Sequence, residues 1–165
     1  MKLFHLFIFG LGMITSALAV AANVSEGAKE RGFNACISDL TDTAKGLELG
    51  NSTGDYAHWY KDNPNNHQYV TIIGNKYSDG QSVAIMGSVP NKEGKCDGFS
   101  AHVFTHELGC AEYRETALKE WKYVGSLAGM LVLENKGGLG KILLPGNNGG
   151  CVSMTFDVFF NMKPN

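Results

Sequence analysis

The sequence lacks the features that mark several common protein classes. Fourteen Lys and Arg residues against 16 Asp and Glu residues give a net charge of -2, which argues against a nucleic-acid partner, because such binding needs a basic surface. There is no Cys-x-x-Cys pair of the kind that holds structural zinc. There is also no P-loop and no β-α-β alternation, so a doubly wound nucleotide-binding fold is not expected. No cofactor is predicted.

Long apolar runs are missing after the N-terminus. Leu3 to Ile14 is almost entirely apolar and is followed by small residues at Ala17 and Ala19, which is typical of a secretory signal peptide. We therefore predict a signal peptide over residues 1–21, cleaved after Ala19 or Ala21. The mature chain is predicted to be one disulfide-stapled domain over residues 22–165, located in the periplasm or secreted, with no membrane insertion.

The four cysteines, Cys36, Cys96, Cys110 and Cys151, all lie in the predicted mature part. An even count in an exported chain predicts two disulfides. Cys96–Cys110 is the favoured pair because a short loop closes at low entropic cost, and this leaves Cys36–Cys151. The crossed pairings remain open.

Hydrophobic periodicity predicts one helix followed by strands. The helix spans Ser25 to Leu49, and Asn51 to His67 breaks the pattern, with a short helical turn around Asp55 to Lys61 as one interpretation. Glu112 to Lys119 is predicted to be a helical turn or a loop. The strands expected are Tyr69–Tyr77, Ser82–Val89, Phe99–Leu108, Leu127–Leu133, Lys141–Leu144 and Val152–Phe160, although Trp121 to Glu134 also fits a helix. The predicted fold class is therefore α+β: an N-terminal helix packed on an antiparallel sheet of about five to six strands.

The last strand alternates clearly. Val152, Met154, Phe156, Val158 and Phe160 fall on one side, which predicts a strand with an apolar side toward the core. Cys151 then falls on the polar side, which conflicts with a disulfide to a core-facing Cys36.

An aromatic segment is the candidate binding surface. Aromatic side chains with polar groups at a loop give a large contact area for little entropy lost. The predicted binding residues are Asp55, Tyr56, His58, Trp59, Tyr60 and His67. The alternative is that Tyr56 and Trp59 fill the end of the sheet.

His102, His106 and Glu107 are weaker candidates for a metal site. On a strand the two imidazoles share a face but stand about 13 Å apart at ~3.3 Å per residue, which is too far for one ion. We therefore expect no metal site and read both histidines as residues of a solvated strand face.

The function expected from these patterns is recognition of another protein. The layout resembles, in architecture only, small envelope proteins that bind or inhibit others. We expect an exported soluble binding protein, such as an inhibitor or immunity protein acting in the bacterial envelope. The alternative is a small exported enzyme or metal-binding protein that uses His102, His106 and Glu107, but no catalytic set is recognisable, so an enzyme is less favoured.

Overall fold

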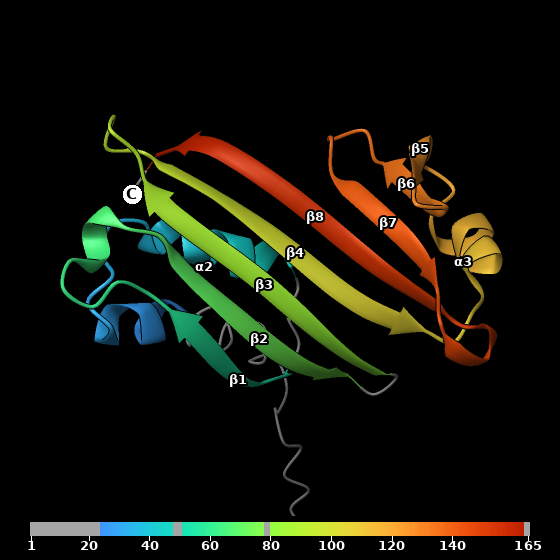
Figure 1. Ribbon diagram of the computed structural model, residues 1–165, viewed down its shortest axis with the longest axis horizontal. Helices are drawn as coiled ribbons and strands as arrows, with labels where there is room; N and C mark the ends of the chain where they lie inside the picture. The colour runs from blue at the N-terminus through green and yellow to red at the C-terminus, as the bar shows by residue number, and fades with distance from the viewer. Residues whose placement is uncertain (1–23, 48–50, 78–79, 164–165) are drawn as a thin grey trace, which may run out of the picture.

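The computed structural model describes residues 24–47, 51–77 and 80–163 (Figure 1). The predicted signal peptide, the predicted helix end at Leu49, and Ser78 and Asp79 between two predicted strands lie outside the described residues. Residues 24–30 are helical. The elements that follow are α2 (Ile37–Gly46), β1 (Asn51–His58), η1 (Pro64–Asn66), β2 (Tyr69–Tyr77), β3 (Gly80–Pro90), β4 (Cys96–His106), α3 (Cys110–Ala117), β5 (Lys122–Leu127), β6 (Met130–Glu134), β7 (Gly140–Pro145), η2 (Asn147–Gly149) and β8 (Cys151–Met162).

The α+β class is confirmed, but the sheet is larger than predicted. It has eight antiparallel strands in the order β1-β2-β3-β4-β8-β7-β6-β5. The two strands that the prediction missed, β1 and β5, are the two edges of the sheet. Edge strands need only one neighbour, and these two carry little apolar alternation, so pairing to β2 and β6 defines them more than their own pattern does. Ala128 and Gly129, with φ of 49° and 85°, form the tight β5–β6 turn.

The prediction of a single helix over Ser25 to Leu49 is wrong. An irregular turn divides this segment into a helix over residues 24–30 and α2. Gly32 begins that turn with φ of 79°, a conformation that favours glycine. The Asn65 side chain then accepts hydrogen bonds from the backbone N–H groups of Asn34 (2.6 Å) and Ala35 (3.0 Å), so a loop 30 residues away fixes the turn.

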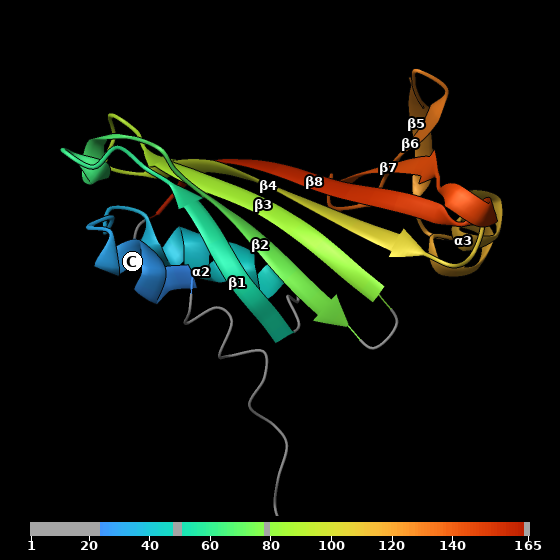
Figure 2. The ribbon, with the colours of Figure 1, turned by 60° about the horizontal axis from the view of Figure 1, so that its bottom comes forward.

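The register assigns every strand residue to one of two faces, because residues paired directly across strands point the same way. His102 on β4 pairs with Ala84 on β3 and with Thr155 on β8, which in turn pairs with Lys141 on β7. Ala84 is buried in the core beneath the helices, so this whole row lies on the helix-covered face, which we call the inner face. The alternate residues form the outer face. Figure 2 shows α2 under one end of the curved sheet.

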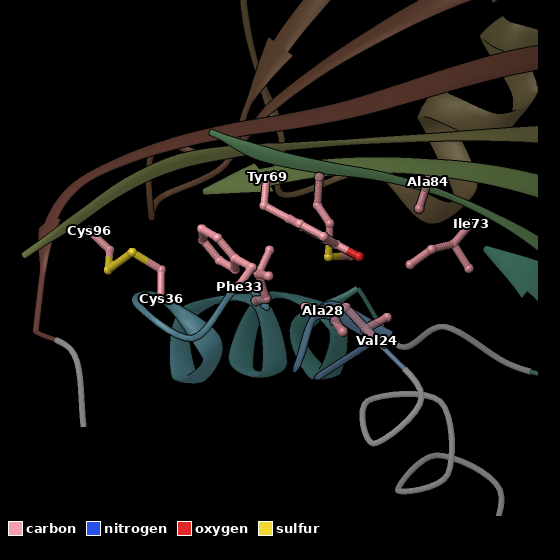
Figure 3. Close-up of a cluster of buried hydrophobic side chains, with 11 residues drawn as sticks. Val24, Ala28, Phe33, Cys36, Tyr69, Ile73, Ala84 and Cys96 are labelled. Carbon is pink, nitrogen blue, oxygen red and sulfur yellow. A yellow bond between two sulfur atoms is a disulfide. The ribbon is translucent and has the colours of Figure 1, made fainter. Parts of the chain in front are cut away.

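The inner face is covered at its two ends by separate clusters. Under β2 and β3, Phe33 stacks on Tyr69 with ring centroids 5.1 Å apart, and both are fully buried (Figure 3). At the other end, Leu118 beside α3 packs with Leu133 and Leu143. Tyr113 of α3 stacks on His106 of β4 at 3.8 Å, which places α3 on the inner face as well.

The favoured disulfide pairing is wrong. The structure joins Cys36 to Cys96 and Cys110 to Cys151. Cys96 begins an 11-residue strand and Cys110 follows its end, so the two lie more than 30 Å apart along β4 at ~3.3 Å per residue. Short sequence separation is therefore a poor guide to distance when the intervening segment is extended. Each disulfide instead ties a helical segment to a strand end on the inner face.

Among the described residues, no helix is long and apolar enough to cross a membrane.

Candidate functional site

The outer face of the sheet is a continuous apolar surface. Val83 on β3 is 45 % exposed and Val158 on β8 is 56 % exposed, although both lie in mid-strand. Half-buried apolar side chains fill the space around them: Ile72, Ile85, Phe99, Val103, Met154 and Phe156. Within residues 24–47, 51–77 and 80–163, no helix lies over this face.

Glycines on neighbouring strands let two aromatic rings lie flat on the outer face. Gly87 pairs with Phe99 and Gly140 pairs with Phe156. A Cβ atom at either glycine would collide with the ring opposite. The rings therefore cover the backbone and add to the area of a smooth apolar surface.

The apolar side of β8 was expected to face the core, but it lies on the opposite, outer face. Val152, Met154, Phe156 and Val158 lie on the outer face, and the polar set that includes Ser153 faces inward. The alternation itself is confirmed. The conflict noted for Cys151 disappears, because the polar side of β8 is the side that carries the disulfide and the helices.

A groove crosses the inner face between the two helix-covered ends. One hollow of about 550 Å³ lies beside α2, where Asp39, Leu47 and Phe159 contribute to its wall. A second, of about 260 Å³, is lined by Phe104, His106, Tyr113 and Lys141. Both hollows are lined by His102 and Thr155, so the two are adjacent at this pair. We call this surface the inner groove.

The inner groove holds a cation and two imidazoles that are partly shielded from water. Burial lowers the pKa of Lys141, whose Nζ lies 5.0 Å from the centroid of the Trp121 ring. Burial, and next the charge of Lys141, lower the pKa of His102. A hydrogen bond of 2.8 Å joins His102 Nε2 to Ser82 Oγ.

At the α2 end of the groove, an acid is buried. Asp39 is only 6 % exposed, and burial raises its pKa despite a 2.6 Å hydrogen bond donated by Ser88 Oγ. The groove therefore presents the carboxyl group of Asp39 at its α2 end and the ammonium group of Lys141 at its other end.

The two histidines considered for an enzyme or metal-binding protein each lie beside a serine. His106 Nε2 is 2.8 Å from Ser153 Oγ, as His102 Nε2 is from Ser82 Oγ, and both serines are buried. In the described part of the chain, no three His, Cys, Asp or Glu side chains are close enough to hold a metal ion. Glu107 lies outside β4, beside a separate hollow near Asn147.

The predicted aromatic segment is divided between surfaces. Tyr56 and His58 lie on the outer face of β1 with their rings 4.9 Å apart. Asp55 points inward and pairs with Arg31 at 3.3 Å. Tyr60 and His67 contact each other at the exposed rim, with ring centroids 4.5 Å apart.

Trp59 is the member of this segment that packs against the core. It lies beside the cluster under β2 and β3, and its ring centroid is 5.5 Å from Arg31 Cζ and 5.9 Å from Lys61 Nζ. Only Tyr56 and His58 therefore extend the apolar outer face.

Sequence reasoning missed both the outer face and Lys141. The available signal was the position of the cysteines. Cys96 lies an even number of residues from His102, and Cys151 lies an even number from Thr155, so each pair shares one face of its strand. A disulfide to a helix marks that face as the covered one. No pattern in the sequence marks Lys141, whose position depends on strand order.

The chain was compared with known proteins in three ways. No protein-family description, curated protein or solved structure matches it.

Proposed function

We propose that this chain is an exported binding protein that recognises another protein, and that the outer face is its docking surface. The observation that carries the proposal is the exposure of Val83 and Val158 in the middle of an apolar face that no described element covers. Apolar patches of this kind mark interaction sites, because exposing them to water is unfavourable. Two disulfides support an oxidising compartment such as the periplasm or the exterior of the cell.

The size of the face favours a reversible complex with a different protein. Five strands spaced ~4.8 Å apart and four rows of side chains ~6.6 Å apart span roughly 600 Å². This is close to the ~800 Å² that each partner buries in a standard heterocomplex and is small for an obligate dimer. Between Lys76 and Asp97 at its margins the face carries no charge, so the partner must present an uncharged apolar patch.

Steric occlusion is the mechanism that suits this surface. The disulfides tie the helices to both ends of the sheet, so the outer face is presented without a large ordering cost on binding. An inhibitor or immunity protein would use such a face to cover a toxin or hydrolase of the envelope. Tyr56 and His58 would extend the contact at the β1 edge.

Native mass spectrometry of the mature protein, isolated from the envelope of its own host under non-reducing conditions, tests the proposal. The design compares the parent chain with Val83→Lys/Val158→Lys on the outer face and with Val124→Lys as a matched control. Val124 is 50 % exposed on edge strand β5, away from the centre of the face. Lysine at any of these exposed positions should leave the unfolding midpoint almost unchanged.

The expected result is a second polypeptide on the parent chain and on the Val124 variant. The purified partner should then bind the double variant at least tenfold more weakly than the parent. Partner binding that the double variant retains would remove the outer face from the proposal. A mass of two identical chains would instead identify a homodimer, and bare monomer from every source would contradict the binding function.

A further inference from the structure

The inner groove contains a cation that has no anionic partner among the described residues. The described residues form five ion pairs, and Lys141 takes part in none of them. Its ammonium group instead lies over the Trp121 ring. A half-buried ammonium group without a carboxylate is costly to keep charged, so it attracts an anion.

Thr155 provides a second donor beside Lys141. The two residues are direct cross-strand neighbours on the inner face. In the described part of the chain, the Thr155 hydroxyl makes no side-chain hydrogen bond, and both residues line the same hollow of about 260 Å³. An ammonium and a hydroxyl group side by side match the two oxygens of a carboxylate.

The adjoining hollow of about 550 Å³ suits an apolar chain attached to that carboxylate. Leu47, Leu139, Phe159 and Met162 contribute apolar surface to its wall. From Thr155 to Phe159 along β8 is about 13 Å at ~3.3 Å per residue, which gives room for a chain of several carbons. Asp157 on the same wall repels a second negative charge, so the anionic group belongs at the Lys141 end.

We propose that the inner groove binds an organic monocarboxylate with an apolar chain, its carboxylate held by Lys141 and Thr155. This site lies on the opposite face from the docking surface, and it goes beyond the proposed function. Occupation of the groove and binding of a protein on the outer face are therefore separate events.

Isothermal titration calorimetry with octanoate, kept below its micelle concentration, tests the site. Octylammonium supplies the same chain with the opposite charge, and acetate supplies the carboxylate without the chain. The variant is Lys141→Met. The control is Lys136→Met. Lys136 is highly exposed, pairs with Glu120 and lies in the turn that leads from β6 into β7.

The expected result is saturable binding of octanoate at least tenfold tighter than that of acetate. Binding should be at least tenfold weaker in Lys141→Met and unchanged in Lys136→Met, with both variants matching the parent in thermal unfolding. Chemical-shift changes at the Trp121 indole and the His102 ring should accompany binding by the parent. Because these signals are measured on the parent protein, they test the site even if Lys141→Met alters folding.

Three results would overturn the proposal. Equal octanoate affinity in Lys141→Met would remove the lysine from the site. Octylammonium binding as tight as octanoate would show an apolar groove without charge preference. Acetate binding as tight as octanoate would show a bare anion site.

Discussion

The inner face of the sheet is covered at both ends and polar in its centre, whereas the outer face is apolar except at its margins and has no cover among the described elements. Both faces depart from the arrangement that minimises the free energy of an isolated chain, in which apolar surface is buried and polar groups are solvated. The difference shows that the short helices cover only part of the sheet. The proposed docking surface and the proposed carboxylate site both lie on the part that the helices leave uncovered.

The largest effect expected from this comparison is a contrast in stability between the two faces. Phe33→Ala empties a fully buried site against Tyr69 and should lower the free energy of unfolding by about 3–5 kcal/mol. Val158→Ala removes a side chain that is already largely in water and should lower it by less than about 1 kcal/mol. Urea unfolding of both variants with the disulfides intact measures the contrast.

Equal losses for the two variants would break the comparison. They would mean that Val158 is covered in solution, for example by a second copy of the chain. Repeating the measurement across a range of protein concentrations separates these cases, because the stability of a dimer depends on concentration.

Alternation along the strands predicted where the strands lie but not which side is covered. The β2 and β3 strands are close to their predicted spans, and the last strand alternates as expected. Periodicity is a local property, so it survives in the fold. The choice of face depends on where helices dock, and the helices dock on the side that carries Cys96 and Cys151, not on the side rich in valine and phenylalanine.

The site residues depend on long-range pairing even more strongly. Lys141 and Thr155 become neighbours only because β7 pairs with β8, and His102 joins them because β8 inserts between β4 and β7. No local pattern encodes that strand order. The aromatic segment was visible in the sequence, but its division between faces follows from β1 being a strand rather than a loop.

The second expected effect is a pH dependence of the free energy of unfolding, and it arises from Asp39 on the inner face. Burial raises its pKa above 3.8, so the folded state binds this proton more readily than the unfolded state does. The stability that this proton contributes is complete below about pH 3.8 and is lost as the pH rises through the folded-state pKa.

Asp39→Asn removes this titration while still accepting the hydrogen bond from Ser88. We expect the variant to be at least as stable as the parent at pH 7 and to lose this part of the pH dependence, measured as the unfolding midpoint from pH 3 to pH 8. Asp62→Asn, at an exposed position whose charge is not among the causes of the raised pKa of Asp39, is the control. A variant that is less stable at pH 7 would show that the charge of Asp39 is favourable.

A smaller gain in stability is expected at Thr71, also on the inner face. Its hydroxyl is buried and has no hydrogen-bond partner among the described residues. Thr71→Val keeps the shape and removes the unsatisfied group, so the free energy of unfolding should rise by about 1 kcal/mol in urea unfolding. Thr105→Val on the exposed outer face should change it very little. A loss at Thr71 would show that the hydroxyl binds water or another group.

The smallest effect is electrostatic and concerns His102. The charged groups that line the groove around it are Lys141 on β7, Asp157 on β8, and Asp39 and Asp42 on α2. Burial, and next the charge of Lys141, lower its pKa below 6.5, so its neutral form stabilises the fold at neutral pH, and that contribution is lost as the pH falls from about 6.5 through the lower folded-state pKa. In Lys141→Met the charge disappears while burial remains, so the pKa of His102 should rise but stay below 6.5.

NMR titration of the histidine ring protons measures this shift, with exposed His58 as the internal control. An unchanged His102 pKa in Lys141→Met would mean that solvent screens the lysine from the imidazole. The groove would then be wetter than its burial indicates, and the carboxylate site proposed at Lys141 would be correspondingly weaker.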